Sequence, residues 1–212
     1  MNHKRMLIAA SIPILLALLV LTTAARSGAA SFAEDFESAE IGALPAGWAT
    51  EMISGDKGVW ATAAATVHPA GQTPQSGDTL VYFNAWSVSS GGSARLFRTL
   101  PVDLSPVHDA WLSFWMYHDT ENTAADRVQV QLSMDAGASW HDVGAPIPRY
   151  TGATGWVSYT VSFQPYMGVG YSDVLIGFLG ISDHGNDIHL DAIAFESVTC
   201  DFDMCTRNDE VH

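Results

Sequence analysis

The chain carries its clearest pattern between Arg127 and Met134, where apolar and polar residues alternate strictly. A period of two places the apolar side chains on one face of a β-strand and the polar side chains on the other. Similar short runs occupy residues 31–37, 59–67, 79–86, 94–100, 110–119, 139–143, 157–163, 173–182 and 188–197. Turn-forming residues fill the gaps between them. Ten short strands at this spacing predict an all-β protein, built as a two-sheet antiparallel β-sandwich.

Two of these runs differ from the rest because they are apolar at nearly every position. They cover residues 110–117 and 174–179. A strand of this kind is either central, with both faces covered, or has one face left open as a binding surface. The sequence leaves both possibilities open.

The first 30 residues have the layout of a secretory signal peptide. Two basic residues precede an uncharged apolar run over residues 6–25, and small residues follow it. This order predicts a signal-peptide helix that is cleaved after Ala25, Ala29 or Ala30. The alternative is an uncleaved membrane anchor, because about 20 apolar residues can span a bilayer.

Removing residues 1–30 leaves a strongly acidic chain. The leader holds three of the nine Lys and Arg residues and none of the 23 acidic residues, so six basic residues remain and the net charge becomes −17. Such a surface repels nucleic acid and anionic lipid, so neither is an expected partner. The charge suits a protein that holds divalent cations, although it also favours solubility by itself.

The remaining length suits one domain over residues 31–198, followed by a polar tail over residues 199–212. The tail holds both cysteines of the chain, Cys200 and Cys205. In an exported protein this C-x4-C spacing predicts a local disulfide. Two cysteines alone do not make a zinc site, even with His212 close in sequence.

A short motif, Ser-x-Asp-x-Gly-x-x-Trp, spans residues 133–140. After Ser133, Asp135 is placed to accept backbone N–H bonds across a tight turn, and Gly137 permits the positive φ that the turn needs. Trp140 begins the returning strand and can cover the turn with its ring. The motif resembles the Asp-box hairpin of sialidases and other secreted β-proteins. Because it occurs only once, it predicts a structural hairpin and not a glycosidase propeller.

Several short phrases fall in an order that is typical of one family. They are DFE at 35–37, LPAGW at 44–48, VW at 59–60, SGD at 76–78, ARL at 94–96, LSFW at 112–115, GW at 155–156, VSF at 161–163 and IHLDAI at 188–193. Together with the hairpin, they resemble the MAM-like jelly rolls. The bacterial cleaved-adhesin or "choice-of-anchor" domains match better than the animal MAM domains. The resemblance covers residues 32–197.

This resemblance implies a two-sheet jelly roll that holds a structural cation, usually calcium, and performs no catalysis. It places the cation on Glu37, which would end the first strand, and on Asp78 and Asp191. Relatives often carry a second acid after the last of these, where this chain has Ala192. That difference weakens or removes the site if the second acid is the ligand.

The residues support the cation site in part. Asp191 has apolar neighbours along its run, so we expect it to be buried, and a buried carboxylate needs a cation or several hydrogen-bond donors. Oxygen ligands of this kind suit calcium. The alternative is that Asp191 only accepts N–H bonds from a neighbouring loop. Strict alternation would place it on the same face as Ile193 and Phe195.

The sequence contains no motif that is typical of an enzyme. Its histidines form no His-Glu-x-x-His pattern, and no Gly-x-Ser-x-Gly turn is present. No run carries the alternating acids of concanavalin-like jelly-roll glycosidases. We therefore expect a non-catalytic protein and keep a secreted glycan-active hydrolase only as a third alternative.

Two kinds of binding protein remain. The first is an adhesion or recognition module for extracellular glycans or surface proteins, secreted or held at a bacterial cell surface. Aromatic residues near turns are its candidate ligand platform: Trp48, Trp86, Trp156, Tyr150 and Tyr166. The second is a structural component of an envelope or matrix that joins its partners through an exposed strand edge. A groove rimmed by exposed aromatic rings would favour the first, and a long uncharged edge strand without such a groove the second.

Overall fold

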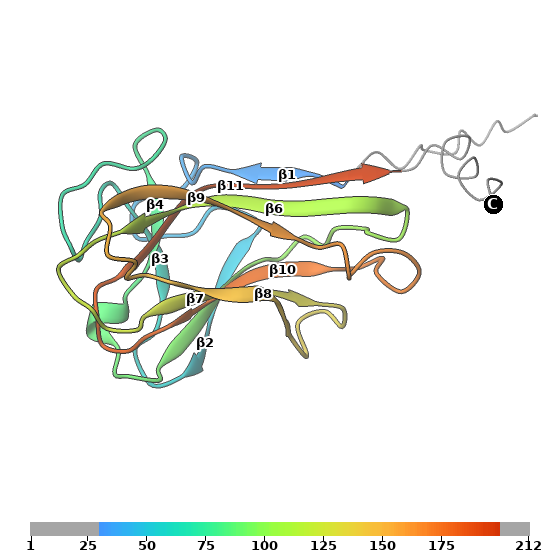
Figure 1. Cartoon of the computed structure of the whole chain (residues 1–212). Helices are drawn as coiled ribbons and strands as arrows, with labels where there is room; N and C mark the ends of the chain where they lie inside the picture. The colour runs from blue at the N-terminus through green and yellow to red at the C-terminus, as the bar shows by residue number, and fades with distance from the viewer. Residues whose placement is uncertain (1–29, 200–212) are drawn as a thin grey trace, which may run out of the picture.

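The protein is described by a computed structural model over residues 30–199, and its regular secondary structure is almost entirely β-strand (Figure 1). The strands are β1 (Phe32–Glu34), β2 (Trp48–Ser54), β3 (Trp60–Ala63), β4 (Leu80–Phe83), β5 (Ser93–Arg98), β6 (Val107–His118), β7 (Arg127–Ser133), β8 (His141–Pro148), β9 (Gly155–Ser162), β10 (Leu175–Ile181) and β11 (Ile188–Thr199). A single 3-10 turn, η1 (Ala85–Ser87), interrupts this pattern within the described residues.

The strands form two antiparallel sheets that pack face to face. Sheet A has six strands in the order β3-β4-β11-β6-β9, with β1 pairing beside β4 along the same edge of β11. Sheet B has five strands in the order β2-β5-β10-β7-β8. The predicted all-β fold with two antiparallel sheets is therefore confirmed.

Alternation along each strand builds the core between the sheets. In β6 of sheet A, every second side chain from Ala110 to Met116 is fully buried. Phe114 of this row meets Phe178 of β10 edge to face, with ring centroids 5.0 Å apart. Burial of these apolar side chains between the sheets is the main source of stability in such a fold.

Ten of the eleven strands fall on the runs that the sequence indicates, and β2 is the strand that those runs miss. β2 lies at the edge of sheet B, and only Trp48 at its start is buried. An edge strand without a buried face has no need for alternation, so its sequence carries no period-two signal.

A β-bulge in β11 overturns one detail of the sequence prediction. Asp191 pairs with Trp115, but Ala194 pairs with Ser113, so β11 has one residue more than β6 over this interval. Ala192 takes up the extra residue with a positive φ of 47°. Alternation restarts beyond the bulge, and Ile193 turns inward instead of sharing a face with Asp191.

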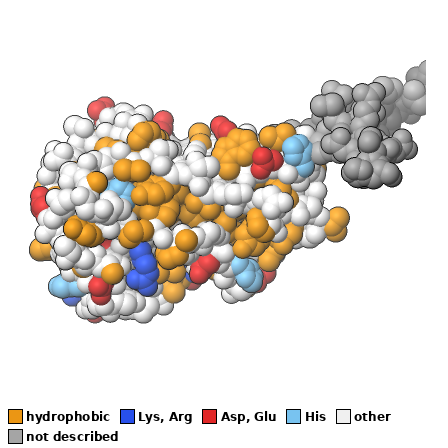
Figure 2. All heavy atoms as spheres, in the orientation of Figure 1, with side chains coloured by type: hydrophobic (Ala, Val, Ile, Leu, Met, Phe, Trp, Pro, Cys, Tyr) orange, Lys and Arg blue, Asp and Glu red, His pale blue; other side chains and the backbone are white. Residues whose placement is uncertain are grey.

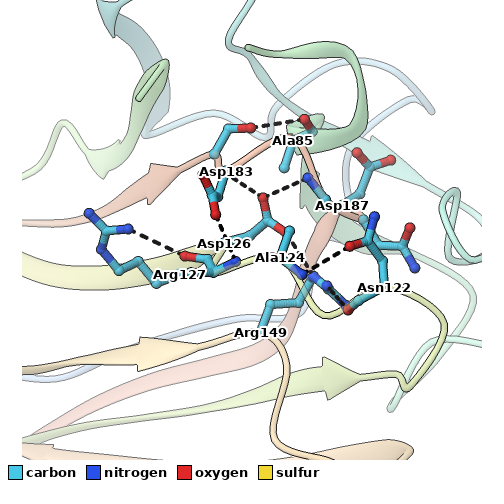
Figure 3. A network of polar contacts seen from close by, with 12 residues as sticks. Ala85, Asn122, Ala124, Asp126, Arg127, Arg149, Asp183 and Asp187 are labelled. Atoms are coloured by element: carbon cyan, nitrogen blue, oxygen red, sulfur yellow. Dashed lines mark hydrogen bonds and ion pairs between the residues drawn. The ribbon is translucent and has the colours of Figure 1, made fainter. Parts of the chain in front are cut away.

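A buried ion cluster ties together the loops at one end of the sandwich (Figure 3). The Arg149 guanidinium contacts Asp119 at 2.5 Å and Asp126 at 3.1 Å, and it also donates to the backbone carbonyl of Asn122. The other oxygen of Asp126 accepts the N–H of Asp183 at 2.7 Å. The cluster therefore fixes the β6–β7, β8–β9 and β10–β11 loops relative to one another.

Several sequence predictions fall on residues outside the described range. The signal peptide over residues 1–30 lies there except for its last residue, and so do Cys200 and Cys205 with nearly all of the polar tail. Within residues 30–199, no helix has the length and apolar character that a membrane crossing needs.

Candidate ligand-binding face

The long β3–β4 loop, residues 64–79, lies across one end of the outer face of sheet A. The backbone N–H of Val67 donates to Nε2 of His189 at 3.0 Å. At the far side of the sheet, the indole of Trp156 donates to the carbonyl of Thr73 at 3.0 Å. The loop therefore covers the part of the face where β11, β6 and β9 approach this end, including Tyr117, which is only 4% exposed.

Two of the three residues predicted to hold a cation meet at the end of this loop. Asp191 accepts the N–H of Ser76 at 3.0 Å and that of Ala192 at 2.6 Å. Glu37 uses one carboxylate oxygen to accept the N–H groups of Asp78 at 2.9 Å and Thr79 at 2.8 Å. Both acids therefore bind the backbone of the same turn. Glu37 lies in the turn after β1, which ends three residues earlier than the sequence suggested.

Opposing effects act on the carboxyl of Asp191. The residue is fully buried, as its sequence neighbours predict. Burial raises the pKa of its carboxyl, backbone N–H groups oppose that rise, and the charge of Glu37 adds to it. Asp78 meets Glu37 through its backbone, and its own side chain is exposed. Within residues 30–199, no three acidic, histidine or cysteine side chains gather closely enough to hold a metal by themselves.

The 133–140 motif forms the hairpin between β7 and β8. Its Asp135 carboxylate accepts the N–H of Ser139 at 2.8 Å and the hydroxyls of Ser139 and Ser133 at 2.5 Å and 2.8 Å. These bonds lower the pKa of Asp135 to about 2. Gly137 has a φ of 92° and accepts the Trp140 indole N–H on its carbonyl at 3.1 Å.

The five aromatic residues singled out as a ligand platform take different places. Trp48 is 8% exposed, packs on Phe36 with centroids 5.9 Å apart, and donates its indole N–H to Glu34. It belongs to the core, so it cannot serve as a platform. Trp156 is half-buried against the 64–79 loop. Tyr150 and Tyr166 are half-buried, and the ring of Tyr166 packs against Phe163 and Tyr171 and not against a tryptophan.

Trp86 is the one member of this set with a largely open ring, at 49% exposure. Its ring stacks on His68, with centroids 4.9 Å apart and planes 7° from parallel. Asp187 holds both partners, because it accepts the backbone N–H of Trp86 and contacts Nδ1 of His68, each at 2.9 Å. Trp86 is therefore held in place by His68 and Asp187, and no second tryptophan lies beside it among the platform candidates.

A second aromatic surface lies on the outer face of β6. The residues that alternate with its buried row are Trp111, Ser113, Trp115 and Tyr117. Both tryptophans are half-buried, and they lie four residues apart, or about 13 Å along the strand. We call the surface made by Trp111, Ser113 and Trp115, with their outward neighbours on β9 and β11, the tryptophan face.

Strand register places a row of small residues between the two tryptophans. Ser113 pairs with Ala194 of β11 and with Thr160 of β9, and Ala194 pairs in turn with Ala33 of β1. This row of small residues crosses four strands, with the Trp115 row on one side and the Trp111 row on the other. A hollow of about 260 Å³ continues it over β1 and the bulge of β11.

The indole N–H groups separate this pair from most other tryptophans. Trp48, Trp60, Trp140 and Trp156 each donate to a protein acceptor. Among the described residues, no acceptor is found for the indole N–H of Trp111 or Trp115, and neither nitrogen is buried. A tryptophan that keeps both ring surface and N–H in reach of solvent can bind a ligand through both.

Sequence reasoning assigned residues 110–117 either to a covered central strand or to one with an open face. The structure shows that one face of β6 is core and that the other is open outside the loop-covered end. The sequence contains one indication of an open face. Trp111, Ser113 and Trp115 lie on the same side of the strand, and a serine between two tryptophans is unusual for a side that is fully covered. Alternation does not tell which face the other sheet covers, so the sequence alone leaves both possibilities open.

A larger hollow, of about 430 Å³, lies on the outer side of sheet B near the 133–140 hairpin. Its lining residues are Phe97, Thr99, Pro101, Ala136, Asp173 and Leu175. This lining combines apolar groups with one carboxylate and contains no tryptophan. The tryptophan face therefore offers the better combination of flat rings and hydroxyl groups.

Known structures share this fold. The K2 cleaved adhesin domain of Lys-gingipain matches with a TM-score of 0.58 and 19% identity, over 78% of this chain and 99% of that domain. The K1 domain of the same protein, from Porphyromonas gingivalis W83, gives 0.54 and 18%, over 79% and 98%. A carbohydrate-binding module of the β-sandwich superfamily gives 0.52 and 14%, over 76% and 60%.

No family model matches the chain, and no curated protein matches it in sequence. The likeness to the adhesin domains and the carbohydrate-binding module lies in the sandwich architecture, because all three identities are below 20%. It agrees with the adhesin-like jelly roll that the sequence resembles, whereas no model of a MAM domain or Asp-box supports the finer assignments.

Proposed function

We propose that this domain is a non-catalytic recognition module that acts outside the cell and binds carbohydrate on its tryptophan face. The observation that carries the proposal is the pair of outward tryptophans, Trp111 and Trp115, on either side of a row of small and hydroxyl-bearing residues. Core packing does not require this arrangement, because the opposite side of β6 already supplies the core.

The chemistry of the face matches that of a sugar chain. A tryptophan ring is flat and apolar with a polar N–H at its edge. A pyranose ring presents C–H groups on its faces and hydroxyls at its rim, so it can stack on the ring and hydrogen-bond beside it. Ser113 and Thr160 supply hydroxyls along the row between the tryptophans, and the Ser113 hydroxyl donates a long hydrogen bond of 3.4 Å to the carbonyl of Ala194. A ligand site that combines aromatic surface with a few placed polar groups follows the general rule for binding sites.

Two further points support the proposal. Solved structures with this fold include adhesin domains and a carbohydrate-binding module. The leader-like first 30 residues support export. The acidic surface also narrows the ligand class, because a net charge of −14 for the full chain opposes sulfated or uronic-acid-rich glycans and favours neutral ones.

A glycan array tests this function. We expect the full chain to bind a restricted set of neutral glycans and the Trp115→Ala variant to lose at least about 2 kcal/mol of binding energy, or roughly thirtyfold in affinity. Trp86→Ala is the matched control, because it removes an exposed tryptophan that lies at the loop end, stacked on His68, and not on the tryptophan face. Silence of the wild-type protein across the array, or loss of binding only in the Trp86 variant, would rule out the proposed site.

We also propose that calcium binds at the turn held by Glu37 and Asp191. Two carboxylates that meet at one turn repel each other, and Glu37 contributes to the raised pKa of Asp191. A divalent cation would relieve this repulsion, and its usual oxygen ligands include both carboxylates and backbone carbonyls. The N–H bonds that both acids accept from the turn are the alternative reason for their position.

A further inference from the structure

The exposed edges of the two sheets are protected in different ways. Strands β1 and β3 are only three and four residues long. Strand β2 carries Glu51 and a register shift, and β8 carries Pro146, Pro148 and another register shift. Short length, charge, proline and bulges are the devices by which proteins stop an edge strand from pairing with another chain.

Strand β9 has none of these protections. It closes sheet A at the edge opposite β3, and its eight residues read GWVSYTVS, without charge and without proline. All eight pair with β6 in unbroken register, from Trp111–Ser162 to His118–Gly155. Valine, threonine, tyrosine and tryptophan are the residues that favour extended pairing.

One row of β9 backbone groups is free to pair outward. In an antiparallel ladder, alternate residues direct N–H and C=O away from the neighbouring strand. Among the described residues, no strand pairs with this side of β9. Figure 2 shows hydrophobic side chains gathered over the region where Figure 1 draws β9 and β8, with charged side chains mostly around it.

We propose that β9 pairs with β9 of a second copy of this chain. The chain has a net charge of −14, so a second copy is repelled from most of the surface but not from this uncharged strand. Antiparallel pairing of one strand with itself is self-complementary, which is what a two-fold interface between identical chains requires. The two copies would then share one continuous sheet.

This arrangement places both tryptophan faces on the same side. The two-fold axis of an antiparallel pair stands perpendicular to the sheet, so the outer face of sheet A stays outward in both copies. From β6 of one copy to β6 of the other there are three strand spacings, or about 14 Å. Two ligand-binding faces this close would act together on a repeating surface, although pairing itself does not depend on ligand binding.

Sedimentation velocity of the full chain tests the proposal directly. We expect a reversible dimer that is weakened roughly tenfold or more by Val157→Lys and equally by Val157→Glu, because either substitution brings two like charges, one from each copy, close to the two-fold axis. Val157 is 41% exposed, so both variants are expected to fold. Ile53→Lys, at 43% exposure on edge strand β2, is the matched control and should leave the dimer intact.

Hydrogen exchange supplies the second readout. The outward amides of β9 should exchange more slowly as protein concentration rises, while those of β2 should not change. A chain that remains monomeric at high micromolar concentration, or a dimer that tolerates both Val157 variants, would overturn the proposal. Glycan binding by a monomeric Val157→Lys variant would show that the ligand face stands without the dimer, so the two claims fail separately.

Discussion

At the residue scale, Asp135 shows how a polar side chain stabilises a turn. Its hydrogen bonds to Ser139 and Ser133 lower its pKa from 3.8 to about 2. The folded state therefore favours the charged form. The stabilisation is present in full above the unfolded value near 3.8 and is lost as the pH falls towards 2.

We predict that the Asp135 carboxyl titrates near pH 2 in the folded protein. The measurement is an NMR titration that follows the chemical shift of the Asp135 side-chain carboxyl carbon. Asp135→Asn should unfold less steeply with acid than the wild type, because the group responsible for part of that slope is gone. A midpoint close to the ordinary aspartate value would show that the hydrogen bonds of the turn do not hold in solution.

The calcium proposal also belongs to single residues. We predict that a chelator lowers the melting temperature of the wild-type domain and has no effect on Glu37→Gln. Glutamine keeps an oxygen that can accept the N–H groups of Asp78 and Thr79, so this variant retains the turn while removing the charge. Asp103→Ala, an exposed acid elsewhere, is the control and should keep the chelator effect. If the melting temperature of the wild-type domain is the same with and without chelator, the calcium proposal is contradicted, and Glu37 and Asp191 serve only to accept backbone hydrogen bonds.

At the scale of single strands, the sequence predicts what local periodicity can encode. The 127–134 alternation identifies β7 because its apolar residues all lie on one face, although the polar face with Gln129 and Gln131 is buried as well. β2 gives no such signal, since its residues beyond Trp48 are not buried. The sequence also gives no sign of the bulge in β11, because alanine, and not the glycine that usually marks a positive φ, occupies position 192.

The same limit applies to the candidate site. Period two places Trp111 and Trp115 on one side of a strand, but it does not say which side faces the other sheet. That depends on pairing with β11 and β9, which are distant in sequence. The convergence of Glu37 and Asp191 on one turn was suggested by family resemblance, whereas their hydrogen bonds to its backbone required the structure.

Strand β10 gives a test of packing between the sheets. A Cβ atom added at Gly180 would lie 2.6 Å from Cγ of Phe83 and 3.0 Å from the ring of Trp60. We predict that Gly180→Ala lowers the free energy of unfolding by about 1–3 kcal/mol, because the core cannot absorb the extra methyl group. Ser54→Ala, at an exposed edge position, should change it by less than about 0.5 kcal/mol. Chemical denaturation measures both, and an unchanged midpoint for Gly180→Ala would mean that the sheets are further apart than described.

At the scale of the whole molecule, the outer face of sheet A has a loop-covered end and an open part. One end of sheet A is covered by the 64–79 loop, next to loops that are held by the Arg149 cluster. The remainder of the outer face of sheet A stays open and carries the tryptophan face. The structure places a long uncharged edge strand, β9, beside the two half-buried tryptophans of β6 on sheet A.

The most direct test of the ligand-binding claim is an NMR titration that follows the indole N–H signals of the seven tryptophans. The titrant is the neutral oligosaccharide that gives the strongest signal on the array. We predict that the signals of Trp111 and Trp115 shift together with one affinity, while those of Trp48 and Trp60, inside the core, do not move. A saturable shift confined to Trp86, or to residues around the sheet B hollow, would contradict the account and move the binding site elsewhere.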